Sequence, residues 1–181
     1  MNKDGRLTSK TAETITLEYS KGYDVYFDHG EPGPFMGTIV SSIDAVPRMG
    51  EELSQLDIAV IEKSSRRAVA LIEIEETTDT PKTFLGDIFG ILMGNSVSFK
   101  GNTGDWKIGS WTTLIVLGCG ENHGPRNERL RELALRAKSA LGTGNSHIGD
   151  IRIASFSEEL SLKDAVMKEI ELARQKAGPM P

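Results

Sequence analysis

Two neighbouring apolar segments near the middle of this 181-residue chain constrain its fold most. Residues 56–61 (LDIAVI) and 68–75 (AVALIEIE) are apolar at consecutive rather than alternating positions, and a polar segment, residues 63–67, separates them. Strands of this composition are covered on both faces of their sheet, and strands joined by a short connection pair antiparallel. The sequence therefore predicts an antiparallel hairpin within a buried sheet.

Helical and extended segments alternate on either side of this hairpin. Apolar side chains recur at helical spacing in residues 8–20, and Thr80-Pro81 is an N-cap followed by a proline that favours a helix start. The predicted helices are residues 8–20, 82–93, 126–141 and 158–176; the other predicted strands are 23–27, 37–46, 112–117 and 148–156. This order predicts an α/β fold with a mixed central sheet and helices on both faces.

Three finer expectations concern the middle of the chain. The helix over residues 82–93 is expected to end at Gly94. Its buried side chains are expected to be Phe84, Leu85, Ile88, Phe89 and Leu92. A glycine-rich loop is expected between this helix and the strand at 112–117.

Length and composition limit the class of protein. A chain of 181 residues fits one domain, for which we expect residues 1–176, with residues 177–181 as a disordered tail. The sequence holds no apolar run of about 20 residues, and its polar N-terminus does not resemble a secretory signal. We therefore expect a cytoplasmic protein with no membrane contact. The net charge of −5 argues against a general nucleic-acid coat protein, but a metal-binding nuclease stays possible.

Acidic residues stand where the predicted hairpin is otherwise apolar. Asp57 lies at the start of the first strand, and Glu73 and Glu75 lie at the end of the second, so an antiparallel pairing brings all three to one edge of the sheet. Glu73 and Glu75 point to the same face, with Cα atoms roughly 6.7 Å apart. The simplest tight turn would set Asp57 opposite Ile74, on the other face. We predict a bulge or a shifted turn that sets Asp57 opposite Glu73 or Glu75.

These three carboxylates have two interpretations from the residues alone. Carboxylates this close repel one another, and a divalent cation such as Mg²⁺ would relieve the repulsion. The alternative is that the acids only solvate the end of a strand. Neither interpretation is excluded by the local sequence.

The spacing of Asp57 and Glu73-Ile74-Glu75 in a hairpin, together with the order of helices and strands, resembles the PD-(D/E)xK nuclease superfamily. The resemblance implies a restriction endonuclease-like fold and the hydrolysis of DNA phosphodiester bonds with Mg²⁺ or Mn²⁺. Two positions depart from the motif. Leu56 stands in place of the proline, and Glu75 replaces the lysine, which makes this the E-x-E variant.

The resemblance also implies a role for each residue. Asp57 and Glu73 would hold the metal ion, which lowers the pKa of a bound water. Glu75 would orient or deprotonate that water, and Lys82 would supply the positive charge of the missing lysine. Two upstream acids are candidates for a further metal ligand: Glu52 and, as second choice, Glu13.

Basic residues outside the motif are candidates for contacts with DNA. Arg126 and Arg129 open the basic helix over residues 126–141, and Lys100 and Lys107 flank the loop that contains Trp106. Such residues could neutralise phosphates, and the tryptophan could instead be a core anchor. By analogy with enzymes of this fold, we expect a homodimer.

Two other functions stay open. A relative of the same fold that has lost the lysine could serve as an inactive binding or assembly module. In addition, the strand ending at Gly118-Cys119-Gly120 resembles the cofactor loop of S-adenosylmethionine-dependent methyltransferases. Against the methyltransferase, Val116 stands where an acid is usual, and no acid closes the strand over residues 148–156.

Overall fold

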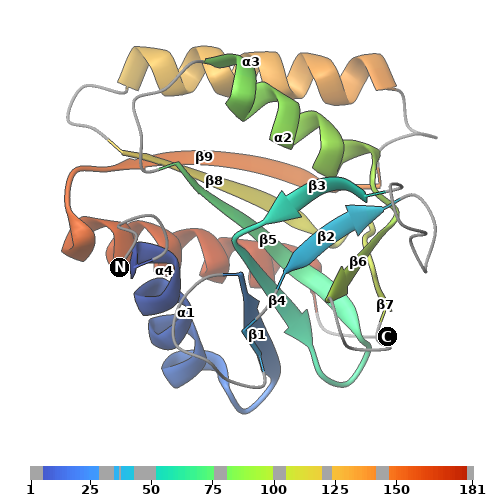
Figure 1. Ribbon diagram of the computed structural model, residues 1–181, viewed down its shortest axis with the longest axis vertical. Coiled ribbons are helices and arrows are strands. Elements are labelled where there is room, and N and C mark those ends of the chain that lie inside the picture. The colour runs from blue at the N-terminus through green and yellow to red at the C-terminus, as the bar shows by residue number, and fades with distance from the viewer. Residues whose placement is uncertain are drawn as a thin grey trace.

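The computed structural model describes residues 6–28, 35–36, 38–42, 52–75, 81–99, 105–119, 124–141 and 147–178. Four helices and nine strands form within them (Figure 1). In chain order they are α1 (Arg6–Tyr19), β1 (Tyr23–Phe27), β2 (Ile39–Ser42), β3 (Glu52–Leu56), β4 (Ile58–Glu62), β5 (Arg67–Glu75), α2 (Pro81–Met93), β6 (Ser96–Phe99), β7 (Asp105–Lys107), β8 (Thr113–Cys119), α3 (Gly124–Leu141), β9 (Asp150–Phe156) and α4 (Glu159–Ala177).

All nine strands belong to one mixed, mostly antiparallel sheet with β5 at its centre. On one side of β5 lie β4 and then β1, both in antiparallel pairings. On its other side β8 and then β9 continue the sheet in parallel. The parallel pairing of β5 and β8 follows from the connection through α2, since parallel neighbours need a crossover. The remaining strands branch off at the first residue of β5 in the order β7, β6, β2 and β3.

Helices cover both faces of the sheet, as the sequence predicts. Figure 1 shows α2 and α3 on one face and α1 and α4 on the other. Along β5, Leu71 packs with the residues under α2, whereas Ala70 and Ile72 pack with the residues under α1 and α4. All three are fully buried. The apolar hairpin is therefore covered on both faces, which confirms the α/β prediction at this level.

The first apolar segment is interrupted, although the sequence predicts one strand over residues 56–61. Leu56 ends β3, Asp57 forms a bend, and Ile58 begins β4. The two strands pair with different partners, since β3 lies beside β2 and β4 lies beside β1 and β5. Asp57 is thus the residue at which the chain passes from the branch of the sheet to its main body.

Two expectations for the middle of the chain are wrong. The expected glycine-rich loop contains β6 and β7, where the alternation in Ser96-Val97-Ser98-Phe99 buries Val97 and Phe99 against the core. Phe89 is 41% exposed because the buried stripe of α2 follows Ile88, Ile91 and Leu92 instead. Trp106 of β7 is buried, in line with a core anchor.

At the C-terminus, Ala177 still belongs to α4, so the helix takes in the first residue of the expected tail. Residues 179–181 of that tail lie outside the described part of the chain. Among the described helices, none combines the length and the apolar composition that crossing a bilayer requires.

Candidate functional site

A bulge in the β4–β5 hairpin sets the register of the acidic residues. The pairing is constant from Ile58 opposite Ile72 as far as Val60, and it shifts by one residue beyond Val60. Continued one residue past Ile58, this register brings Asp57 opposite Glu73. Without the shift Asp57 would lie opposite Ile72 and therefore on the other face. The predicted bulge is confirmed, whereas the pairing of these two acids stays a prediction, since the observed register ends at Ile58 opposite Ile72.

Main-chain and side-chain contacts fix Asp57 over the end of β5. The N–H of Ile74 donates a hydrogen bond of 2.7 Å to Asp57 Oδ2. The hydroxyl of Thr8, on α1, lies 3.5 Å from Oδ1, and the N–H of Asp28, just after β1, donates to the main-chain carbonyl of Asp57 at 2.9 Å. Three separate segments therefore hold this residue at one edge of the sheet.

Glu73 carries a buried carboxylate oxygen. It faces α2, and its Oε1 is shielded from solvent and has no hydrogen-bond partner in the described structure. Burial raises the pKa of Glu73 well above its ordinary value, and the neighbouring negative charges raise it further. In decreasing order of effect, these charges are Asp57, Asp87, Glu75 and Asp28.

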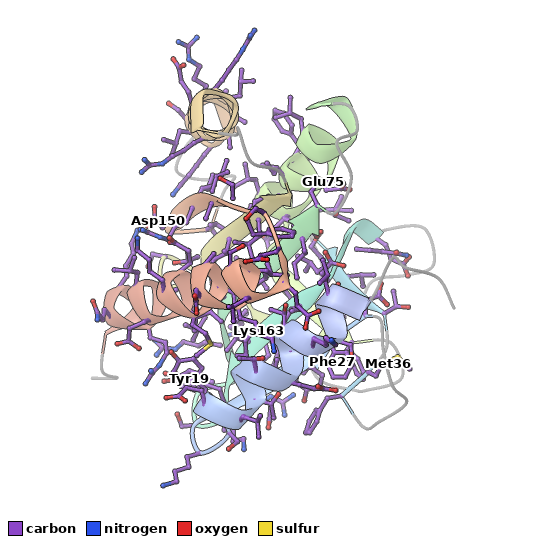
Figure 2. The ribbon with its side chains drawn as sticks, turned by 90° about the vertical axis from the view of Figure 1, so that its left-hand side faces the viewer. Tyr19, Phe27, Met36, Glu75, Asp150 and Lys163 are labelled. Atoms are coloured by element: carbon purple, nitrogen blue, oxygen red, sulfur yellow. The ribbon has the colours of Figure 1, made fainter. Side chains whose placement is uncertain are left out.

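A small recess lies between the end of β5 and α2. Its volume is about 30 Å³, enough for a water molecule or a small ion. The lining residues are Glu73, Ile74, Glu75, Asp87, Ile88 and Val116. Figure 2 shows Glu75 at the end of β5 beside α2. The two glutamates of the motif therefore share this recess with an acid that comes from the following helix.

The sequence prediction missed Asp87. Burial raises the pKa of Asp87, the charge of Glu75 raises it further, and a hydrogen bond with the Ser54 side chain acts in the opposite direction. A signal was present in the sequence: Asp87 comes one residue before Ile88 and four before Ile91, both fully buried. An acid on the buried side of an apolar helix indicates either a partner or a function.

Asp28 was also missed. It follows the last residue of β1, which pairs with the first residue of β4. Because β1 and β4 are antiparallel, the end of β1 lies at the edge where β4 begins. Predicting this position would require knowing that β1 pairs with β4, and the local sequence does not show which strands are neighbours.

The two upstream acids do not join this group. Glu52 is exposed at the first residue of β3, and Glu13 is exposed on α1. Neither lines the recess. The additional acids near Glu73 are therefore Asp87 and Asp28, and not Glu52 or Glu13.

The basic candidates are placed differently from one another. Lys107 is exposed and pairs with Arg67 at the start of β5, whereas Glu73 lies six residues further along, about 20 Å away. Arg129 is exposed on α3. Arg126 and Lys82 belong to the first turns of α3 and α2, but their side chains, like all of Lys100, lie outside the described structure.

The charged side chains that line the recess are all acidic. None of the ion pairs between described residues involves Glu73 or Asp87. Within the same part of the chain, no group of three or more His, Cys, Asp or Glu side chains is arranged to hold a single metal ion. The acids are therefore neighbours around a recess and do not form one closed cage.

The chain was compared with protein-family models, with curated proteins and with solved structures, and no match was found.

Proposed function

We propose that this protein is a Mg²⁺-dependent endonuclease that hydrolyses phosphodiester bonds in DNA, built on a restriction endonuclease-like core. The observation that carries the proposal is the buried Oε1 of Glu73, which has no hydrogen-bond partner among the described residues although Asp57 lies near it at the edge of a bulged hairpin. A fold gains nothing in stability from collecting acids around a buried carboxylate. Such a group is expected where its function is to bind a cation.

The residues of the recess fit a divalent cation. They offer carboxylate oxygens, which are the ligands that Mg²⁺ prefers, and Mg²⁺ is commonly held by one or two carboxylates while waters and substrate phosphates complete its octahedron. A pair of acids is therefore sufficient, and a group of three is not required. When bound, Mg²⁺ or Mn²⁺ would lower the pKa of a water ligand and stabilise negative charge on the phosphate.

Different residues of the chain are proposed to bind the cation and to accept the proton. Asp57 is oriented by the N–H of Ile74 and its charge acts on the neighbouring Glu73, so these two carboxylates would hold the cation. Glu75, on the same face two residues further, accepts the proton of the attacking water. The water oxygen bonds to phosphorus as the P–O bond to the leaving oxygen breaks, and that oxygen takes a proton from solvent.

The topology supports a restriction endonuclease-like core. A helix precedes the antiparallel strands β1, β4 and β5, and a crossover helix then leads to β8, which is parallel to β5. This is the order that the resemblance implies. The strands β2, β3, β6 and β7 are additions at one end of β5.

Two further elements of the proposal concern DNA and charge. The helix α3 starts after β8, whose end lies beside Glu75, so its first turns follow the edge that carries the acids. Arg129 and Arg126 on these turns are proposed to neutralise phosphates. Lys82, in the first turn of α2, is proposed to stabilise charge on the phosphate.

A homodimer remains a prediction, which light scattering after gel filtration tests.

A cleavage assay tests the proposal. Supercoiled plasmid, single-stranded DNA and a four-way junction are incubated with the protein in Mg²⁺, in Mn²⁺ and in EDTA. We expect cleavage that requires the metal, is abolished by Glu73→Gln and is unchanged by Glu52→Gln, which removes an exposed acid away from the recess. DNA binding without cleavage in either metal, equally strong in Glu73→Gln, would favour the inactive binding module instead.

A further inference from the structure

Two lysines from opposite faces of the sheet meet at one main-chain oxygen. Lys138 lies in the last turn of α3 and Lys176 in the last turn of α4, and these helices cover different faces. Lys138 Nζ donates to the carbonyl oxygen of Gly149 at 2.8 Å, and Lys176 Nζ donates to the same oxygen at 3.0 Å. The two ammonium nitrogens are therefore no further apart than the sum of these two distances.

These contacts differ from the usual role of a basic residue at a helix end. Lysines there commonly stabilise the last carbonyls of their own helix. Lys138 and Lys176 instead reach the residue just before β9, which pairs only with β8 among the described strands and so lies at the edge of the sheet. Figure 2 shows Asp150, the first residue of β9, between α3 and α4. The side chain of Lys176 is 42% exposed, so solvent reaches this place.

The main chain fixes the carbonyl that gathers the two lysines. The N–H of Gly149 donates to the carbonyl of Thr112 at 2.9 Å, and the N–H of Asp150 lies 3.3 Å from the same oxygen. A Cβ atom on Gly149 would overlap the main-chain oxygen of Ser110, so only glycine permits this close approach. The point at which the ammonium groups converge is thus held against the start of β8 and does not depend on a loose loop.

Positive charge exceeds negative charge among the described residues around this point. Oδ2 of Asp150 lies 3.6 Å from Lys176 Nζ and 3.7 Å from Nη1 of Arg152, distances too long for hydrogen bonds. Arg152 also donates to the buried Glu169, and this pair balances its own charge. The two ammonium groups of Lys138 and Lys176 are then left with the single carboxylate of Asp150.

The two lysines also oppose each other's charge. Burial lowers the pKa of Lys138, the positive charge of Lys176 lowers it further, and Asp150 acts in the opposite direction. An ammonium group has three N–H donors, of which Gly149 receives one from each lysine. An anion with several acceptor oxygens would relieve the repulsion and accept hydrogen bonds from both groups.

We propose that Lys138 and Lys176 form a binding site for a phosphate group at the start of β9. Phosphate offers several acceptor oxygens and up to two negative charges near neutral pH, and lysine is a common partner for it. This site is separate from the acidic recess. Asp150 pairs with Thr113, which pairs with Ala70, and Glu75 lies five residues beyond Ala70, about 17 Å along β5.

The phosphate group has two possible sources. A backbone phosphate of DNA would make the site a second contact for the substrate, and in that form the inference rests on the proposed function. A small phosphate compound would bind at the same two lysines whether or not the protein cleaves DNA. The chemistry of recognition is the same in both cases, so inorganic phosphate is the first probe.

Thermal melting in EDTA tests the site without any cleavage. Sodium phosphate is titrated at pH 7, with sodium chloride at matched ionic strength as the reference. Because phosphate also stabilises proteins generally, the readout is the difference between variants. We expect a saturable rise in Tm in the wild type that is lost in Lys138→Met/Lys176→Met. Each single variant should weaken the apparent affinity for phosphate by about tenfold.

Lys63→Met is the matched control. Lys63 Nζ also donates to a main-chain carbonyl, that of Ser20 at 2.7 Å, and also lies near an acid, Asp24 at 3.4 Å. No second lysine donates to that carbonyl among the described residues. We expect Lys63→Met to respond to phosphate as the wild type does. The Tm of each protein in chloride alone shows that it is folded.

A DNA-binding assay then identifies the source of the phosphate. The anisotropy of a fluorescent duplex is followed in EDTA over a range of KCl concentrations. If the source is DNA, the double variant should bind more weakly than Lys63→Met, with a salt slope smaller by about two. Unchanged DNA binding, with the phosphate response lost, supports the same site with a small phosphate compound as its ligand.

The inference is overturned if phosphate raises the Tm of the wild type and of the double variant equally. The two lysines would then only tie α3 and α4 to the edge of the sheet. The outcome is independent of the recess, because the melting is done without a divalent cation. If DNA is not cleaved but the phosphate response requires Lys138 and Lys176, the proposed function fails and the phosphate site stands.

Discussion

The main-chain N–H of Ile74 donates a 2.7 Å hydrogen bond to Oδ2 of Asp57, so the residue between the two motif glutamates orients the third acid. The donor belongs to the main chain and is therefore independent of the side chain at position 74. Any cation held by Asp57 and Glu73 would meet a carboxylate whose direction is set by the backbone of β5. The hairpin would thus supply both the proposed ligands and part of their orientation.

This bond predicts opposite effects of two substitutions on the stability of the metal-free protein. Asp57→Ala leaves the Ile74 N–H without its acceptor and is expected to cost about 1 kcal/mol or more. Glu73→Gln removes a buried carboxyl group whose ionisation burial and like-charged neighbours oppose, and it is expected to raise the free energy of unfolding. Urea unfolding in EDTA at pH 7 measures both. A large loss of stability in Glu73→Gln would show that its carboxylate is structural.

The pH dependence of the free energy of unfolding should reflect the raised pKa of Glu73. Burial and then the charge of Asp57 raise its pKa well above the ordinary 4.5. Between 4.5 and the raised pKa, the native protein keeps a proton that the unfolded chain has released. The free energy of unfolding contributed by Glu73 therefore falls as pH rises through this window. Asp87, whose pKa is also raised, contributes with the same sign.

Urea unfolding in EDTA from pH 4 to pH 8 checks this dependence, with Glu73→Gln as the comparison. The variant lacks the titrating carboxyl, so its stability should exceed that of the wild type by an amount that grows with pH. Adding Mg²⁺ at high pH should reduce the difference, because a cation favours the charged form. Parallel curves for the two proteins would contradict the raised pKa.

How much of the site the sequence predicts depends on how local each contact is. The hairpin, the shared edge of Asp57, Glu73 and Glu75, and the need for a bulge all follow from short-range pairing. The approach of Asp87 does not, because it depends on how α2 packs on β3 through Gly90. Packing between elements leaves only a faint sequence signal, here an acid beside the buried Ile88.

The fold shows the same limit. The long apolar strands and the amphipathic helices are predicted within a few residues of their observed bounds. The short strand β6 is missed, since an alternation of only four residues between glycine-rich segments is indistinguishable from loop composition. The break at Asp57 is also missed, because Leu56 and Ile58 are equally apolar and differ only in which strand they join.

Two glycines of α2 should respond oppositely to alanine. At Gly90 a Cβ atom would meet the main-chain oxygen of Leu53 at 2.6 Å, so Gly90→Ala has to displace α2 from β3 and is expected to cost about 1–3 kcal/mol. At Gly86, which is exposed, nothing lies within 4 Å, and alanine is expected to stabilise the helix by up to about 1 kcal/mol. Thermal or urea unfolding compares them.

The same pair of variants reports on the recess. Because Asp87 lies between these glycines on α2, a displaced helix in Gly90→Ala should weaken Mn²⁺ binding, whereas Gly86→Ala should bind as the wild type does. Equal Mn²⁺ affinity in both variants would mean that the position of α2 against β3 does not determine the recess.

The ion pair between Arg152 and Glu169 should matter far more than a pair on the surface. Arg152, on β9, donates through Nε to Glu169, which is buried on α4 with only 7% of its surface exposed. Arg152→Met strands this carboxylate in the interior and is expected to cost about 3 kcal/mol. The matched control is Arg136→Met, which breaks an exposed pair with Glu132 on α3 and should cost no more than about 0.5 kcal/mol.

A double variant separates a lost attraction from a stranded charge. Adding Glu169→Met to Arg152→Met removes the buried carboxylate, so much of the lost free energy of unfolding should return, because an apolar pair can replace a buried ion pair with little penalty. Urea unfolding at pH 7 measures the three proteins. If Arg152→Met is no more damaging than Arg136→Met, the pair does not anchor α4 to the sheet, and the burial of Glu169 needs another explanation.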